Sequence, residues 1–347
     1  MKETYTALKE FGAAFLGPAL TAYSRAVEKE AAGKLPVCLA REGWLLHQLL
    51  THLHAEGLIQ LGQAPVYLKV SRTLLFRATL GERATWDIAL NMEFQGTLLE
   101  LLIKRFGLQL HEAYACLPAE VLGFELTLPD QADTVREWLN PHAERLMRQV
   151  EPTRQAVHCY FQEQGLMGEA MPLMLDVGYS GSIQKLCTRF IERETTGLYF
   201  IANKPGKQQV GDQVASMKGV FREGVGWKES YTMLERSLLL ECLMTAPHGQ
   251  VVDIRQRQDG SHLFFYGREA SSQRYYQNLA AVLEGAKEAV TEAFRNEVTY
   301  SIEEVEALYE VFATRPGAIP RAAWHLFTAD DDITGNGMVN PLQIFGI

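Results

Sequence analysis

The segment MPLMLDVGYSGSIQKLC, residues 171–187, joins one acid to a run of small residues. Asp176 ends an apolar stretch, and the small residues follow at once: Gly178, Ser180, Gly181 and Ser182. A short loop between a strand and a helix can present several backbone N–H groups to one anion, assisted by the helix dipole. A carboxylate repels a phosphate but suits a hydroxylated ring, a metal ion or a positive charge that develops in a transition state. Together these features favour a phosphorylated sugar as ligand.

A structural interpretation of the same segment stays open. Ser180 is a good residue for capping the first turn of a helix, and Asp176 is able to satisfy backbone N–H groups without touching any ligand. Under that interpretation the segment is a glycine turn between a strand and a helix, and its acid has no chemical role.

Two more polar clusters stand at the ends of apolar runs. Arg41 and Glu42 follow residues 35–40, and Ser71 and Arg72 end the run that begins at residue 64. The planar guanidinium of an arginine holds a phosphate through two parallel hydrogen bonds. Glu42 is suited to hold Mg²⁺ or to take a proton from a hydroxyl. The alternative for Arg41 and Glu42 is a surface ion pair.

Glu241 lies inside the apolar run LLLECLM. A carboxylate in such surroundings is costly unless it is paired. It is therefore either a general base or the ion-pair partner of Arg41 or Arg72, and the sequence leaves both roles open.

The pattern of apolar residues predicts an α/β protein with a mostly parallel, Rossmann-like sheet flanked by helices. We expect strands over residues 35–40, 64–71, 171–177 and 196–203, and the first two enclose one helix, as in a βαβ unit. Residues 76–166 read as a helical insertion in an α/β core that spans residues 1–260. Residues 261–347 read as a mainly helical C-terminal region packed on that core.

Two smaller elements are expected near the end of the core. Residues 229–245 have the spacing of a single helix, and Asp259–Gly260 predicts the turn of a β-hairpin. Because ligands of parallel α/β sheets bind at the carboxyl ends of the strands, the three polar clusters are expected to share one site.

Composition excludes several classes of function. The 347 residues carry a net charge of −9, which argues against a non-specific nucleic-acid binder. Neither a signal peptide nor an apolar run long enough to span a membrane is expected from the sequence. Five scattered cysteines without a CxxC motif predict reduced thiols and a cytoplasmic location. The acidic motif at 330–337 has Pro341 where a calcium loop needs its last acid.

The loop after Asp176 resembles the phosphoribosyl-diphosphate loop of phosphoribosyltransferases. In that loop a strand ends in two acids, and an apolar residue, two variable residues, Thr or Ser, glycine, a further variable residue and Thr follow. Asp176, Val177, Ser180 and Gly181 match this order. Two positions depart from the pattern: the first acid is Leu175, and the last hydroxyl falls on Ile183. Contacts to the ribose hydroxyls would therefore differ.

Residues 10–260 also resemble the glycan phosphoribosyltransferase domain of bacterial ribofuranosyltransferases, which build surface polysaccharides. The matching segments are FLGPAL (15–20), LAREGWLL (39–46), YLKVSR (67–72), LDVGYSGSIQ (175–184) and LLLECLMTAPHG (238–249). The family usually has Arg-Asp-Gly where this chain has Arg41-Glu42-Gly43. Its frequent partner, a haloacid-dehalogenase-type phosphatase domain, has no counterpart here, because no DxDxT motif opens a strand.

The resemblance implies transfer of a 5-phosphoribosyl group from phosphoribosyl diphosphate to a glycan or lipid-linked glycan, in the cytoplasm or at the inner face of the membrane. Mg²⁺ is expected with the diphosphate, and a separate phosphatase would act on the product. Asp176, Glu42 and Glu241 would be the catalytic acids. The residues expected to bind substrate are Arg41, Gly43, Ser71, Arg72, Gly178, Tyr179, Ser180, Gly181, Ser182 and Gln184. Two alternatives stay open: a glycosyltransferase that uses a nucleotide sugar, and a non-catalytic subunit that binds a phosphorylated ligand.

Overall fold

A six-stranded sheet forms the centre of the protein, whose computed structural model describes residues 2–331 and 337–347. Most of the acidic motif at 330–337 lies outside these residues. The strands lie in the order β2 (Val66–Leu68), β1 (Lys34–Leu39), β5 (Met171–Tyr179), β6 (Thr195–Ala202), β8 (Gln213–Glu223) and β7 (Gly206–Val210). The first five are parallel, and only β7 runs antiparallel to its neighbour. The predicted α/β class with a mostly parallel sheet is confirmed.

The parallel strands, counted along the chain, have the spatial order 2-1-3-4-5. This is the order of a doubly wound sheet, in which successive connections leave toward opposite sides from the middle. The direction of winding reverses between β1 and β5. The connections that follow these two strands therefore leave toward opposite faces of the sheet. A crevice remains between them at the strand ends, and this is the usual ligand site of such sheets.

Both faces of the sheet are buried, which explains the nearly continuous apolar sequences of β1, β5 and β6. Side chains of β5 alternate between two apolar clusters: Leu173 and Leu175 belong to one, and Met174 to the other. The first cluster includes α2 (Gly17–Glu30) and α3 (Gly43–Ala55). The second includes α10 (Ala143–Glu163) and α11 (Ser182–Ile191).

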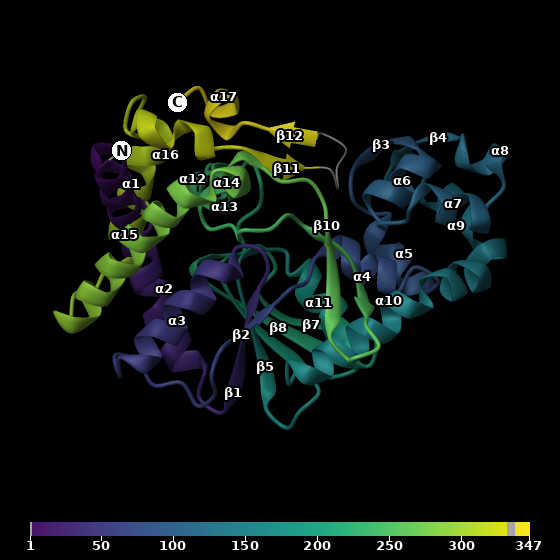
Figure 1. Cartoon of the computed structure of the whole chain (residues 1–347), viewed down its shortest axis with the longest axis horizontal. Helices are drawn as coiled ribbons and strands as arrows, with labels where there is room; N and C mark the ends of the chain where they lie inside the picture. Colours follow the sequence, from purple (N-terminus) through teal and green to yellow (C-terminus); the bar gives the residue numbers. More distant parts are fainter. Residues whose placement is uncertain (1, 332–336) are drawn as a thin grey trace.

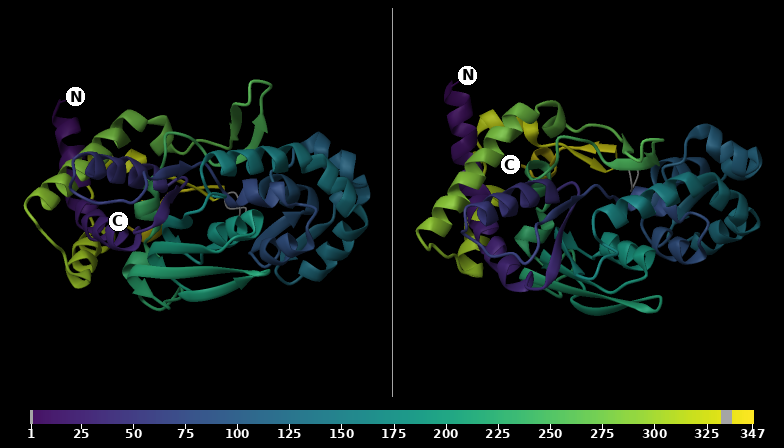
Figure 2. Two further views of the ribbon diagram at one scale, coloured as in Figure 1. Left: turned by 90° about the horizontal axis from the view of Figure 1, so that it is seen from below. Right: turned by 60° about the horizontal axis from the view of Figure 1, so that its bottom comes forward.

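The insertion at one end of the molecule is mostly helical, as predicted (Figure 1, blue; Figure 2). Its helices before α10 are α4 (Arg72–Ala78), α5 (Arg83–Ala89), α6 (Leu98–Lys104), α7 (Leu110–Cys116), α8 (Ala119–Leu122), α9 (Ala132–Leu139) and η1 (Asn140–His142). It also contains a small antiparallel pair, β3 (Phe94–Thr97) with β4 (Glu125–Leu128), which the sequence analysis missed. Four-residue strands give too short an alternation to be recognised among helices.

The predicted hairpin, β9 (Val251–Gln256) with β10 (His262–Tyr266), connects the core to the C-terminal region. The helices that follow are α14 (Ser271–Arg274), α15 (Tyr276–Arg295), α16 (Ile302–Thr314), η2 (Arg321–Leu326) and α17 (Pro341–Phe345). The last hairpin pairs β11 (Ala329–Asp331) with β12 (Gly337–Val339). Helix α15 packs along α1 (Lys2–Phe15). The last helix, α17, lies near the same end of the molecule, so that both ends of the chain are on one side of the sheet (Figure 1).

The prediction of a single helix over residues 229–245 is wrong. Two short helices occupy the segment, α12 (Thr232–Glu235) and α13 (Leu238–Leu243). Between them the backbone hydrogen bonds from Ser237 to Leu234 and from Leu239 to Arg236 span three residues instead of four. This tighter turn changes the direction of the chain and brings α13 to the strand ends. Within the described ranges, no helix has the length and apolarity needed to cross a membrane.

Candidate active site

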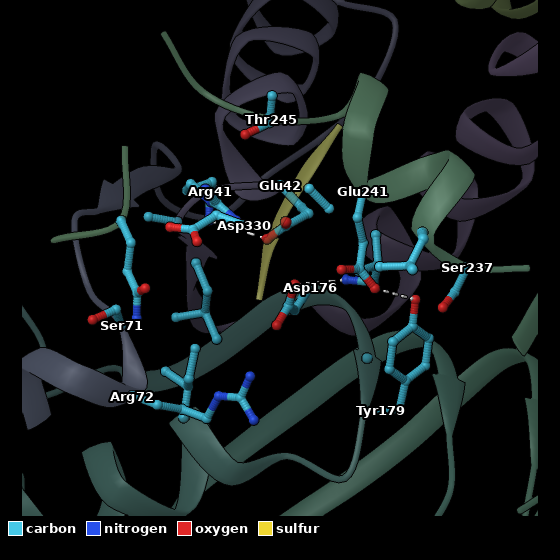
Figure 3. A pocket seen from close by; sticks show the side chains of 18 of the residues that line it. Arg41, Glu42, Ser71, Arg72, Asp176, Tyr179, Ser237, Glu241, Thr245 and Asp330 are labelled. Carbon is cyan, nitrogen blue, oxygen red and sulfur yellow. Dashed lines mark hydrogen bonds between the residues drawn. The ribbon is translucent and has the colours of Figure 1, made fainter. Parts of the chain in front are cut away.

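A cavity of about 490 Å³ lies at the carboxyl ends of the parallel strands, next to the crevice between β1 and β5. It gathers side chains from segments that are far apart in the sequence (Figure 3). The predicted site residues that line it are Arg41, Glu42, Ser71, Arg72, Asp176, Gly178, Tyr179, Ser180, Gly181, Ser182, Gln184 and Glu241. Only Gly43 of the predicted set is not part of its wall.

Asp176 lies at the floor of the cavity with 8% of its surface exposed. Its carboxylate accepts a hydrogen bond from the backbone N–H of Val177, at 2.8 Å. Burial raises the pKa of Asp176 well above its usual range, and the charge of Glu42 raises this pKa further; the Val177 N–H opposes the shift. Such a group ionises readily only when a positive charge arrives beside it.

Glu241 reaches the cavity from α13 and accepts a hydrogen bond from the hydroxyl of Tyr179, at 2.9 Å. Burial and the charge of Glu42 raise the pKa of Glu241 to about 7, although the Tyr179 hydroxyl and Arg41 act in the opposite direction. A carboxyl that titrates near neutral pH is suited to accept a proton during a reaction. Glu241 is therefore a candidate for the general base.

Arg41 and Glu42 do not form the surface ion pair considered above. The Glu42 carboxylate accepts a hydrogen bond from the backbone N–H of Arg41, at 3.1 Å. Among the described residues, no carboxylate lies within ion-pair distance of the Arg41 guanidinium. Both side chains line the cavity instead (Figure 3). Their charges are therefore placed to act on a ligand.

The loop after Asp176 is shorter than expected, because β5 continues through Gly178 and Tyr179 before the chain turns. These residues pair with Ile201 and Ala202 of β6. A Cβ at Gly178 would lie 2.5 Å from the carbonyl oxygen of Ile201, so glycine permits this close pairing. Only two residues, 180 and 181, separate β5 from α11.

Helix α11 points its N-terminus into the cavity wall at Ser182 and Ile183. Its capping residue is Gly181, in a left-handed conformation with φ of 66°, and no side chain caps it. The structural role proposed above for Ser180 is therefore wrong, since its hydroxyl contacts that of Ser182, at 3.0 Å. The first N–H groups of a helix have no partner within the helix and attract anions.

Two predicted contact residues are already engaged by the protein. Ser71 caps α4 by accepting from the N–H of Leu74, at 3.0 Å, and donates to the carbonyl of Val251, at 2.5 Å. Gln184 is fully buried; its amide donates to Thr195 and Ser216 and accepts from Tyr199. Both side chains shape the cavity wall rather than offer an unoccupied polar group.

Gly43 also has a structural reason to be glycine. It begins α3, where a Cβ would lie 2.5 Å from the carbonyl carbon of Cys38 in β1. This close approach of helix to strand sets where Arg41 and Glu42 leave β1.

Gly43→Ala should lower the free energy of unfolding by about 1–3 kcal/mol, because the backbone of Cys38 has no room to move away from a methyl group. Urea denaturation measures this loss. The matched control is Gly62→Ala, where the nearest atom would lie at 3.5 Å, an ordinary contact. Equal stability of the two variants would contradict the packing role of Gly43.

Other residues of the wall were not predicted from the sequence. Trp227, Asn203 and Thr245 line the cavity, and Asp330 reaches it from the C-terminal hairpin, where it pairs with Arg268 at 3.2 Å. Asn203 carried a usable signal, since it is a polar residue at the end of an apolar strand, like Asp176. Trp227 and Asp330 carried none, because only the folded chain brings their segments over the strand ends.

The expectation of Mg²⁺ was tested against the side chains of the site. Among the residues that the structure describes, no group of three or more His, Cys, Asp or Glu side chains is placed to hold a metal ion. Mg²⁺ commonly binds through one or two carboxylates together with substrate phosphates. Glu42 and Asp176, which line the cavity, are carboxylates of this kind.

Comparisons with known proteins leave the site to be interpreted from its own chemistry. No protein-family model matches the chain, and no curated protein matches it. Among the described residues, two arginines, four carboxylates and a helix N-terminus surround one cavity, and such a set can bind an anionic ligand, stabilise a positive charge beside it and accept a proton.

Proposed function

We propose that this protein is a glycosyltransferase that moves a 5-phosphoribosyl group from phosphoribosyl diphosphate to a hydroxyl of a glycan. The observation that carries the proposal is the convergence of opposite charges on one cavity. Arg41, Arg72 and the N-terminus of α11 offer positive charge to phosphates, and the acids Asp176 and Glu241 line the same cavity (Figure 3). A ligand with both a diphosphate and a ring that turns cationic suits this combination.

The proposed reaction is a displacement at the anomeric carbon of the ribose. The hydroxyl oxygen of the acceptor forms a bond to this carbon, the bond to the diphosphate oxygen breaks, and the electron pair leaves with the diphosphate. The acceptor proton passes to Glu241 or Glu42. Asp176 faces the positive charge on the ring, which is largest in the transition state.

Mg²⁺, when bound, would neutralise the charge of the leaving diphosphate, with Asp176 or Glu42 as candidate ligands. The acceptor would be a glycan or a lipid-linked glycan, used in the cytoplasm or at the inner face of the membrane. The product would keep its 5-phosphate, so that a separate phosphatase would complete the sequence.

The proposal is tested by a binding screen. Purified protein is heated with phosphoribosyl diphosphate or with a set of nucleotide sugars, each with and without Mg²⁺, and the shift in melting temperature is measured. Stabilisation by phosphoribosyl diphosphate but by none of the nucleotide sugars supports the proposal. Stabilisation by a nucleotide sugar supports the alternative donor. Binding of phosphoribosyl diphosphate without turnover of any glycan would favour a non-catalytic subunit.

Arg41→Ala should weaken binding of phosphoribosyl diphosphate about tenfold or more. A charge-assisted bond to phosphate contributes roughly 1.5–3 kcal/mol, and 1.4 kcal/mol corresponds to a factor of ten. Calorimetric titration measures the dissociation constant. Arg83→Ala, on the exposed surface of α5 and outside the cavity wall, is the matched control. An unchanged constant for Arg41→Ala would remove Arg41 from the donor site.

A further inference from the structure

The walls of the cavity differ in chemistry on the two sides of Asp176. Arg72 and Ser71 lie on one side of Asp176, and Tyr179, Glu241 and Ser237 lie on the other (Figure 3). The first side suits the phosphates of the donor. The second is aromatic and hydroxylated and carries an acid, so a second ligand of different character fits there.

Trp227 is the large aromatic side chain of this second wall. It stands in the loop between β8 and α12, lines the cavity and remains 54% exposed. Its ring meets that of Tyr179 edge to face, with 5.9 Å between the ring centroids. Single exposed aromatic residues are common on proteins. Trp227 differs because its exposed surface borders a cavity that holds a candidate base.

Asn203 adds an unsatisfied polar atom to the same wall. Its backbone N–H donates to the carbonyl of Tyr179, at 2.9 Å, so the two residues sit side by side at the ends of β6 and β5. The side-chain oxygen of Asn203 is buried and has no hydrogen-bond partner among the residues that the structure describes. A buried acceptor without a partner destabilises the protein until a donor reaches it. A diphosphate has no proton to donate to this oxygen, whereas a sugar hydroxyl has one.

We infer that Trp227, Tyr179 and Asn203 form the binding site for the acceptor sugar, with one ring face on Trp227 and one hydroxyl donating to Asn203. The inference rests on the proposed function, because it assigns the second substrate of the same cavity. An apolar face with a few placed polar groups is the usual composition of a small-ligand site. The weakly positive C–H groups of a sugar ring are attracted to the negative face of an aromatic ring.

This placement puts an acceptor hydroxyl beside Glu241, since Tyr179 contacts both the candidate base Glu241 and the aromatic ring of Trp227. Its hydroxyl donates to Glu241 at 2.9 Å, and its ring contacts Trp227. The attacking oxygen would lose its proton to Glu241 as it bonds to the anomeric carbon. Tyr179 is then a positioning residue, which holds the base at a fixed distance from the bound sugar.

The test uses methyl glycosides of the common hexopyranoses as probes, with phosphoribosyl diphosphate present, and saturation-transfer NMR as the readout. Trp227→Ala should weaken glycoside binding about tenfold, Trp227→Phe should keep most of it, and Asn203→Ala should weaken it as well. The matched control is Trp324→Ala, which removes a tryptophan that is 43% exposed and outside the cavity wall. Melting temperatures check that each variant folds.

The outcomes separate this inference from the proposed function. Glycoside binding that Trp227→Ala leaves unchanged, or that Trp324→Ala weakens equally, overturns the inference even if the donor binds. Uridine diphosphate binding that depends on Trp227, without glycoside binding, overturns it in favour of a nucleobase site. If phosphoribosyl diphosphate fails to bind the native protein, the proposed function falls, whereas glycoside binding that depends on Trp227 would still support the sugar site.

Discussion

The Asp176→Asn variant is expected to transfer the ribosyl group roughly 10²–10³-fold more slowly than the native protein while binding phosphoribosyl diphosphate nearly as well. Removing one preorganised electrostatic contact typically costs this factor in rate. In the proposed reaction the carboxylate of Asp176 faces a charge that is largest in the transition state, so its loss should affect turnover more than ground-state binding. Steady-state kinetics and calorimetric titration on one preparation measure both quantities.

The stability of the same variant provides a separate check. Because the pKa of Asp176 is raised in the folded protein, the folded state holds this proton more tightly than the unfolded state does. The native protein therefore gains stability from Asp176 at low pH and loses it as the pH rises from about 4 through the folded pKa. As the pH is raised from 5 to 8, the melting temperature of Asp176→Asn should therefore fall less than that of the native protein.

Asp212→Asn, at an exposed position between β7 and β8, is the matched control for both measurements. It should leave turnover and the pH dependence of melting unchanged. A stable Asp176→Asn protein with native turnover would remove Asp176 from the chemistry. Lower stability with near-native turnover would instead favour a structural role for its bond to Val177.

The sheet was predictable from the sequence because its parallel strands are buried on both faces. Apolar runs such as residues 35–40 and 196–203 are too short for helices and too uniform for exposed strands. The winding rule then placed Arg41, Arg72 and Asp176 at one edge, since the carboxyl ends of parallel strands meet there. In the structure all three line one cavity.

The other parts were not predictable because their signals are tertiary. Gly178 and Tyr179 extend β5 only because β6 offers Ile201 and Ala202 as pairing partners. Ser71 and Gln184 look like ligand contacts in the sequence, yet neighbours that are distant along the chain occupy their polar atoms. No local sequence pattern marks Trp227, because only the folded chain places it beside the cavity.

Arg77→Ala should lower the free energy of unfolding by roughly 3–5 kcal/mol, the cost of leaving buried partners without their opposite charge. The Arg77 side chain is fully buried in α4; its nitrogens lie 2.7 Å from Glu112 and 3.1 Å from Asp253. Burial alone would raise the pKa of Glu112, but the bonds from Arg77 and from the N–H of Gln109 lower it to about 2. Urea denaturation measures the loss.

The matched control is Arg136→Ala, which breaks the partly exposed pairs with Asp87 and Asp133 and should cost no more than about 1 kcal/mol. Equal losses in the two variants would contradict the buried network. Arg77→Lys keeps the positive charge but not the planar guanidinium, so its free energy of unfolding should lie between those of the native protein and Arg77→Ala.

The network also links the insertion to the cavity. Arg77 lies on the same helix as Arg72, Glu112 belongs to α7 of the insertion, and Asp253 belongs to β9. Breaking it should loosen the helix that carries Arg72, which lines the cavity. Arg77→Ala should therefore weaken binding of phosphoribosyl diphosphate as well as stability, although Arg77 itself does not line the cavity. If a destabilised Arg77→Ala protein bound the donor with native affinity at low temperature, α4 would be held in place by its apolar contacts alone.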